Sequence, residues 1–221
     1  MASGYDGMRW VARHGSFNDA NHVRFVDDDF IGHDLDTLDK WRLQNTGGRG
    51  SHQVKDDDAN GILQLLTGNQ AADLMTLDMN NKRQVDPSLS PAILFRVKTL
   101  SAADVEIRMG LVDVLDTDHC IFEADISVDA SWFAESYAAG AQTETVDTAI
   151  ALDAAYHYFG IYINSAGRPF WYIDGVLENE GDDADVDPAE FFQPFLEIEA
   201  EAGADPKTLE VDFIKGWQRR E

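Results

Sequence analysis

Hydrophobic and polar residues alternate along most of the chain, in short segments that are separated by turn residues. In the segment 93–100, three apolar side chains fall on one face of an extended chain, while Arg96 and Lys98 fall on the other. The segment 105–112 repeats the pattern. Because successive side chains of a β-strand point to opposite faces, this period of two predicts half-buried antiparallel strands.

The same alternation predicts further strands, two tight turns and one short helix. Asn164–Gly167 and Asp174-Gly175 each contain a glycine that can adopt the positive φ of a hairpin turn. Asp187 followed by Pro188 predicts a helix at residues 188–192, because Asp caps helices and Pro is accepted at the first helical position. The predicted strands are 61–66, 93–100, 105–112, 121–128, 145–150, 156–164, 169–173, 195–199 and 209–217.

These elements place the chain in the all-β class. About a dozen short strands, almost no helix and no internal repeat favour a single β-sandwich. Two packed sheets could bury most of the 12 Phe and 5 Trp residues. We divide the chain into a polar N-terminal arm at residues 1–24, where periodicity is weak, and one domain at residues 25–221.

The charge of the chain limits its partners. The 221 residues include 41 Asp and Glu against 17 Lys and Arg, which gives a net charge of −24. Such a surface repels phosphate groups, so we expect neither a nucleic acid nor a membrane as a partner. The hydrophobic fraction of 44% is high enough to form a core, which argues against disorder. The acidic excess is consistent with Asp in β-turns, with a saline environment, or with cation sites.

The cysteine content and the first residues bear on the compartment. Cys120 is the only cysteine, which excludes an internal disulfide and a zinc site built from cysteines. The first seven residues contain no basic region followed by an apolar one, so we expect no secretory signal. We therefore expect a protein that is made and assembled inside a cell.

Three segments resemble those of concanavalin A-like lectin and glucanase (LamG-like) domains. They are the opening Phe25–Phe30 together with Leu35, Leu38 and Trp41, the hairpin Tyr156–Leu177, and the closing segment Leu209–Ile214. Together they frame nearly the whole chain from Phe25. The resemblance implies a jelly roll, a β-sandwich of two curved antiparallel sheets.

The resembled fold is similar to domains of virion structural proteins in tailed bacteriophages. By this analogy we predict a non-enzymatic capsid decoration (cement) or spike protein that is located in the virion and acts by surface binding. Its partners would be capsid or other virion proteins, and it would form homo-oligomers such as trimers. The alternatives are a carbohydrate-binding, lectin-like module and a β-glucanase-like glycoside hydrolase.

Two acidic segments are candidates for glycoside hydrolysis. In the glucanase branch of the resembled fold, carboxylates at positions i, i+2 and i+4 of one strand share a face and flank one glycosidic bond. Glu123 and Asp125 match the first two positions, but Ser127 stands at the third and cannot serve as an acid. The segment 197–201 has all three carboxylates but falls on the predicted penultimate strand, where a solvated acidic face is expected. We therefore predict no catalytic residues.

The resemblance also implies one structural Ca²⁺, which joins the opening of the chain to its last strand. Asp29, the carbonyl group of Gly61, and Asp212 match the expected ligand positions, and Ca²⁺ prefers oxygen ligands. Strict alternation places Asp212 on the face opposite Val211 and Phe213.

Three other groups of residues are assigned to structure rather than to chemistry. The segment 118–120 contains His and Cys, but adjacent residues of a strand point to opposite faces. Gly47–Gly50 lacks the Lys of a phosphate-binding loop. The aromatic residues of 132–137 and 170–172 could stack on a bound glycan, yet packing in the core is their default.

Overall fold

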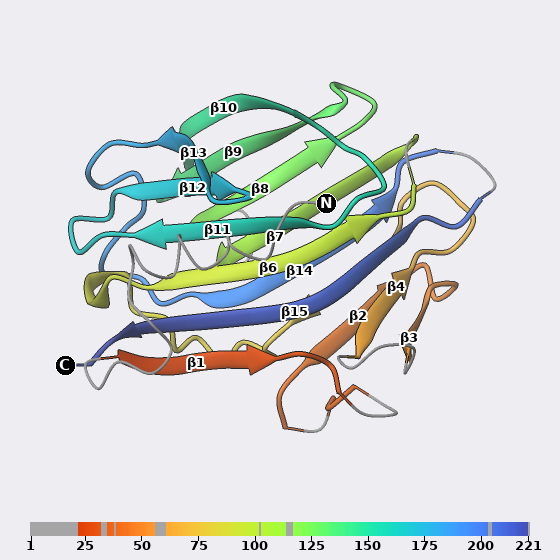
Figure 1. Cartoon of the computed structure of the whole chain (residues 1–221), viewed down its shortest axis with the longest axis horizontal. Coiled ribbons are helices and arrows are strands. Elements are labelled where there is room, and N and C mark those ends of the chain that lie inside the picture. Colours follow the sequence, from red (N-terminus) through yellow and green to blue (C-terminus); the bar gives the residue numbers. More distant parts are fainter. Residues whose placement is uncertain are drawn as a thin grey trace.

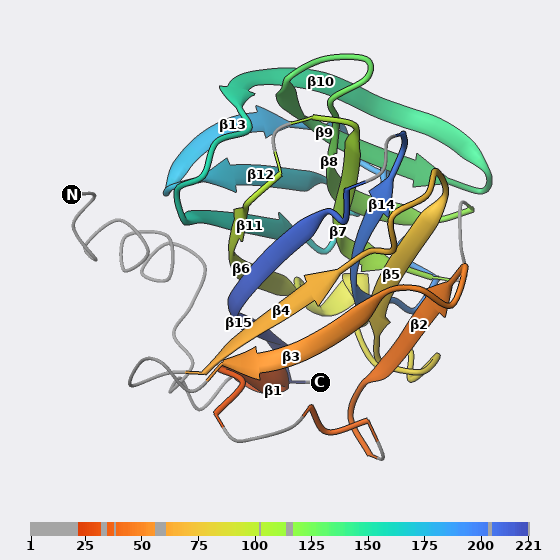
Figure 2. The ribbon, with the colours of Figure 1, turned by 90° about the vertical axis from the view of Figure 1, so that its right-hand side faces the viewer.

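The protein is a two-layered β-sandwich. The computed structural model describes residues 22–31, 35–37, 39–55, 61–101, 103–113, 117–202 and 205–220. Within these ranges, two antiparallel sheets of eight and seven strands pack face to face (Figures 1 and 2). The predicted all-β jelly roll is therefore confirmed.

Sheet A contains eight strands in the order β13-β12-β11-β6-β15-β4-β3, and β1 also pairs with β15. The strands are β1 (His22–Asp28), β3 (Ser51–Lys55), β4 (Ile62–Leu66), β6 (Ala92–Thr99), β11 (His157–Ile163), β12 (Pro169–Ile173), β13 (Val176–Glu180) and β15 (Thr208–Arg219).

Sheet B contains seven strands in the order β10-β9-β8-β7-β14-β5-β2. The strands are β2 (Arg42–Thr46), β5 (Asp73–Asp78), β7 (Val105–Val112), β8 (His119–Asp125), β9 (Ser131–Ala138), β10 (Ala141–Ala151) and β14 (Gln193–Ala200).

The main hydrophobic core lies between the two sheets. Strand β8 contributes Cys120, Phe122 and Ala124 to this core, all fully buried. The indole nitrogen of Trp171 on β12 donates a hydrogen bond of 2.9 Å to the carbonyl group of Ile121 on β8. A buried tryptophan N–H needs such a partner, and here the partner belongs to the opposite sheet, so the bond links the two layers.

The alternating pattern located the strands of the core well. Each predicted strand overlaps an observed one, and the segment 105–112 coincides with β7. The pattern did not predict β1, β2, β3, β5, β9 or β13. Several of these strands lie near the sheet edges and are polar on both faces. In Arg42–Thr46, for example, no residue is fully buried, so the strand shows little of the contrast that marks a half-buried strand.

The hairpin between β12 and β13 has the predicted turn. Asp174 and Gly175 have φ angles of 50° and 81°, which place both residues in the left-handed region. Two-residue hairpins of type I′ require positive φ at both central positions, and the Asp-Gly pair accepts this geometry.

The helix predicted at residues 188–192 is wrong. Asp187 accepts a hydrogen bond of 2.8 Å from the backbone N–H of Ala189, but the chain forms only a turn there. Phe192 then pairs with Val85 in an isolated β-bridge, so the stretch between Asp187 and Phe192 is too short for a regular helix. The same Asp-Pro signal does begin a 3₁₀ helix at Pro87–Leu89.

The first described strand begins earlier than the predicted domain boundary. Strand β1 starts at His22, which pairs with Arg219, so residues 22–24 belong to sheet A rather than to the predicted arm of residues 1–24. The remainder of that arm lies outside the described residues. Among the described residues, we find no helix with the length and apolar character needed to cross a membrane.

A charged histidine joins the turn between β12 and β13 to the start of β11. In His157, Nδ1 lies 2.6 Å from Asp174 Oδ2, and Nε2 lies 3.0 Å from Asp153 Oδ1. The hydrogen bond to Asp174, supported by that to Asp153, raises the pKa of His157 to about 9. The imidazolium is therefore held between two carboxylates at neutral pH.

Replacement of His157 should therefore have a pH-dependent cost. A pKa that is raised on folding contributes stability that is complete below the unfolded value of 6.5 and is lost as the pH rises through about 9. We expect His157→Gln to lower the free energy of unfolding at pH 6 by about 1–2 kcal/mol, after discounting for solvent screening. Urea unfolding should show a smaller loss at pH 10, and an equal loss at both pH values would contradict this interpretation.

Candidate active site

Polar side chains gather on the outer face of sheet B, which points away from the core. Because Phe122 and Ala124 of β8 face the core, Glu123 and Asp125 face outward. In the register of the sheet, Glu123 lies opposite Arg108 of β7, and Arg108 lies opposite Glu197 of β14. Residues from three neighbouring strands therefore meet on one surface.

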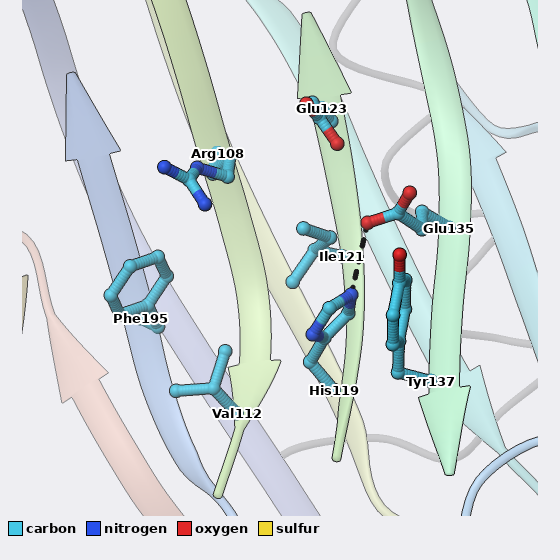
Figure 3. A pocket seen from close by; sticks show the side chains of 8 residues that line it. All are labelled: Arg108, Val112, His119, Ile121, Glu123, Glu135, Tyr137 and Phe195. Atoms are coloured by element: carbon cyan, nitrogen blue, oxygen red, sulfur yellow. Dashed lines mark hydrogen bonds and ion pairs between the residues drawn. The ribbon is translucent and has the colours of Figure 1, made fainter. Parts of the chain in front are cut away.

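A cavity of about 290 Å³ opens on this face (Figure 3). Two further cavities adjoin it. One of about 180 Å³ shares Val112 and Phe195 with it, and one of about 200 Å³ shares Glu123 and Glu135. We call the three together the groove. The central cavity is lined by Arg108, Val112, His119, Ile121, Glu123, Glu135, Tyr137 and Phe195.

The groove crosses the strands rather than running along them. Its lining extends from Arg42 on β2 to Thr145 on β10, which are the two edge strands of the seven in sheet B. With neighbouring strands about 4.8 Å apart, the six intervals span roughly 29 Å. The three cavities together therefore reach across the width of sheet B.

Glu123 is the carboxyl group with the most unusual ionisation in the groove. Its burial, followed by the negative charges of Glu135 and Glu106, raises the pKa of Glu123 to about 7. Arg108 opposes this shift but does not cancel it. A carboxyl group in this environment keeps its proton up to near neutral pH and can act as an acid.

The pKa of Asp125, two residues further along β8, is shifted in the opposite direction. Burial alone would raise its pKa, but hydrogen bonds from Ser127, Glu201 and the backbone outweigh burial and lower the pKa of Asp125. The backbone N–H and the hydroxyl group of Ser127 lie 2.9 Å and 2.7 Å from Asp125 Oδ1. Strand β8 ends at this turn, so Ser127 belongs to a loop rather than to the strand.

Arg108 is fixed among the acidic residues. Its side-chain nitrogens lie 3.0 Å from Glu106 and 3.0 Å from Glu197. The hydroxyl group of Thr76 donates a hydrogen bond of 2.8 Å to Glu197, which holds that carboxylate from its other side. Arg108 therefore supplies a positive charge at the centre of a strongly acidic surface.

Glu135 on β9 faces Glu123 from the neighbouring strand. His119 Nε2 lies 3.0 Å from Glu135 Oε1, and Gln142 Nε2 donates a hydrogen bond of 2.8 Å to Glu135 Oε2. The ring of His119 packs on Tyr137 with centroids 4.4 Å apart. Glu135 was not among the candidates predicted from the sequence. The alternation of Trp132 and Ala134 in the core would have placed it on the outer face.

Glu123 and Asp125 lie together, whereas the acidic segment 197–201 differs from its prediction. Glu123 and Asp125 share the outer face of β8, as predicted. The segment 197–201 was predicted to form a solvated acidic face. Instead β14 lies next to β7 inside sheet B, and Glu197 is only 7% exposed. Strand order in the sheet differs from order in the sequence, which a pattern along one strand does not reveal.

The predicted calcium ligands converge only in part. Asp28 at the end of β1 pairs with Ile214, and Leu63 of β4 pairs with Val211, so Asp29, Gly61 and Asp212 come to one level of the sheet. However, Asp212 forms an ion pair with Arg96, so its carboxylate does not fit the predicted calcium site without giving up that partner. Among the described residues we find no group of three or more metal-ligating side chains. The bound Ca²⁺ stays a prediction.

A β-bulge explains a related error in alternation. The pairing of β15 with β6 shifts between Val211 and Phe213. One extra residue reverses the faces of all later side chains. Val211 and Ile214 both face the core as a result, whereas Phe213 packs in a separate cluster with Trp217. The predicted shared face of Val211 and Phe213 is therefore wrong.

The aromatic candidates divide among the core, the groove and a separate apolar cluster on sheet A that contains Phe170 and Tyr172. Trp132 and Trp171 are buried in the core, as predicted for aromatic residues of alternating strands. Phe133 and Tyr137 line cavities of the groove. In the segment 118–120, His119 reaches the groove and Cys120 the core, so the two point to opposite faces as expected.

Comparisons with known proteins show the fold. No family model matches the chain, and no curated protein matches it. Several solved structures are similar to the chain. A non-specific endo-β-1,3(4)-glucanase of glycoside hydrolase family 16 has a TM-score of 0.70 at 13% identity, over 91% of this chain and 93% of the glucanase. The laminarinase from Rhodothermus marinus has a TM-score of 0.69 at 13% identity, over 90% and 98%.

A third similar structure is an immunostimulatory antigen and pseudo β-1,3-glucanase of Mycobacterium tuberculosis. Its TM-score is 0.67 at 14% identity, over 89% of this chain and 99% of the antigen. These identities are low, so the likeness concerns the fold, which is the concanavalin A-like jelly roll of these proteins.

The comparisons correct the function that was predicted from the sequence. A non-enzymatic virion decoration or spike protein is contradicted, because the similar structures include a series of β-glucanases and laminarinases. The same finding contradicts the prediction that the protein is not an enzyme. The carbohydrate-directed alternatives are better supported, and the chain has the jelly-roll fold on which such glucanases are built.

Proposed function

We propose that the protein is a glycoside hydrolase that binds a neutral β-linked glucan in the groove and cleaves it. The observation that carries the proposal is the contrast between Glu123 and Asp125 on the outer face of β8. Glu123 holds its proton to about pH 7, while the pKa of Asp125 is lowered. Neighbouring carboxyl groups whose pKa values are pushed apart mark a site of acid–base chemistry, and Glu123 is the acid that glycoside hydrolysis needs.

The fold and the lining of the groove support this substrate class. The similar structures include enzymes described as an endo-β-1,3(4)-glucanase and a laminarinase. The groove offers the rings of Phe133, Tyr137 and Phe195 beside charged groups. Ligand sites commonly combine such apolar surfaces with a few placed polar groups, which suits a sugar ring with its apolar face and hydroxyl edge.

The charge of the groove favours a neutral polymer. Arg108 stands among carboxyl groups from β7, β8, β9 and β14. An anionic polysaccharide would meet repulsion from most of this surface, because like charges in a low-dielectric cleft repel strongly. The carboxyl groups on the described part of the outer face include Asp78, Glu106, Glu123, Asp125, Glu135, Glu197 and Glu199.

A carbohydrate-binding module without hydrolysis is the second candidate. It is favoured by Ser127, which stands at the third carboxylate position of the resembled glucanases and lies in a turn beside Asp125. A fold of this kind need not keep its activity, since one similar structure is described as a pseudo β-1,3-glucanase.

Hydrolysis of a β-glucan tests the proposal. We expect the protein to release reducing ends from laminarin or a mixed-linkage β-glucan, with a rate that falls as the pH rises through about 7 because Glu123 loses its proton. Glu123→Gln should lower kcat/KM by at least about 100-fold and leave glucan binding in place.

The matched control is Glu178→Gln, because Glu178 lies on β13 of sheet A and burial also raises its pKa. This variant should keep full activity. Binding without cleavage in the wild-type protein would favour the second candidate, and absence of both binding and cleavage would refute both.

The charge argument gives a second test, by affinity electrophoresis in gels that contain dissolved polysaccharides. A neutral β-glucan should retard the protein, whereas a sulfated galactan should not, at low and moderate ionic strength. Retardation by the sulfated polymer that exceeds retardation by the glucan would contradict a groove for neutral chains.

A further inference from the structure

We propose that Glu135 on β9 is the second catalytic carboxylate of this site, and that His119 on β8 positions it. The inference rests on the proposed hydrolase function. In the resembled glucanases the carboxylates stand on one strand, but here β8 ends at Asp125 and Ser127 occupies the third position. Glu123 takes the acid role that Ser127 cannot fill, and the second carboxylate would therefore come from the neighbouring strand.

The strand register places the two glutamates within reach of each other. Glu123 pairs with Phe133, and Ile121 pairs with Glu135. Glu123 and Glu135 are therefore diagonal neighbours on one face, with Cβ atoms about 7 Å apart. Figure 3 shows the carboxylate of Glu135 turned toward β8, between Glu123 and His119. Both glutamates line the central cavity and the adjoining one, so they flank the point where the two cavities meet.

Glu135 is held in place by two different donors. Gln142 binds one of its oxygens and His119 faces the other, while the Glu135 side chain is only 13% exposed. An ionised carboxylate accepts hydrogen bonds and donates none, so His119 carries its proton on Nε2 when it faces the ionised Glu135. His119 is 5% exposed and packs on Tyr137, which limits rotation of its ring.

Glu123 is the proton carrier of this site up to near neutral pH. A carboxyl group that is partly buried beside a second one does not ionise readily. The proton stays on Glu123, because burial and the charge of Glu135 favour its neutral form. Glu135 has a nitrogen partner at each carboxylate oxygen, His119 Nε2 at Oε1 and Gln142 Nε2 at Oε2, which hold it in one orientation.

This arrangement supports hydrolysis in two balanced steps. In the first, a Glu135 oxygen forms a bond to the anomeric carbon, the glycosidic bond breaks, and the leaving oxygen takes the proton of Glu123. In the second, a water oxygen bonds to the same carbon, its proton passes to Glu123, and the ester bond to Glu135 breaks. The pair regains its single proton, and the sugar keeps its anomeric configuration.

The first experiment measures hydrolysis of an activated aryl β-glucoside of a glucan oligosaccharide. We expect Glu135→Ala to lower kcat by at least about 1,000-fold, as loss of a nucleophile does, while Glu178→Ala has no effect. Added azide should restore turnover of the Glu135→Ala variant and give a glycosyl azide of inverted configuration. A product of retained configuration would assign Glu135 the acid role instead and overturn the proposal.

The second experiment tests the positioning role of His119. Glutamine can place an amide N–H near the position of His119 Nε2, and alanine cannot. We expect His119→Ala to lower kcat with little change in KM, and His119→Gln to recover part of the loss. Equal losses in both variants, or a change confined to KM, would contradict positioning of Glu135 by His119.

The third experiment needs no substrate. Carbon-13 NMR of the side-chain carboxyl groups should show Glu123 titrating near pH 7 in the wild-type protein and at lower pH in Glu135→Gln, because a charged neighbour is removed. An unchanged titration of Glu123 would contradict its pairing with Glu135. The cleavage assays separate this inference from the proposed function. If wild-type protein cleaves glucan and Glu135→Ala cleaves it equally well, the assignment of Glu123 and Glu135 as a catalytic pair (the dyad) is wrong, while the proposed function stands. If wild-type protein cleaves no glucan, the proposed function and the dyad both fail.

Discussion

The site depends on the strict alternation of one strand, β8, between two environments. Cys120, Phe122 and Ala124 anchor it in the core, and the same backbone therefore presents Glu123 and Asp125 to the groove. A hydrogen bond from Trp171 to the β8 backbone ties the strand to the opposite sheet. A slip of one residue would exchange the two faces and place carboxylates in the core, so the register of β8 is the constraint on which the ionisation of Glu123 depends.

The chain's large negative charge affects the ionisation of one side chain in the groove, Glu123. Most carboxylates of a protein with a net charge of −24 are solvated, but Glu123 is partly buried beside Glu135 and Glu106. Burial and like charge both favour the neutral acid, so the acidic composition and the packing together create a proton donor. Arg108, which pairs with Glu106 and Glu197, offsets part of this negative charge.

Local alternation predicted the fold class, most core strands and the shared face of Glu123 and Asp125. It could not predict which strands become neighbours, so Glu135 was missed and Glu197 was placed in a solvated face. It also failed at Asp212, where a bulge adds a residue and reverses the faces of the strand. Information about side-chain period lies within a strand, whereas strand order and bulges are set by long-range packing.

The most direct test of this account is a crystal structure of the Glu123→Gln variant with a β-glucan oligosaccharide. We expect the sugar chain to cross the strands of sheet B in the groove, with one glycosidic bond between position 123 and Glu135. A glycan bound on the outer face of sheet A, with the groove of sheet B open to solvent, would contradict it.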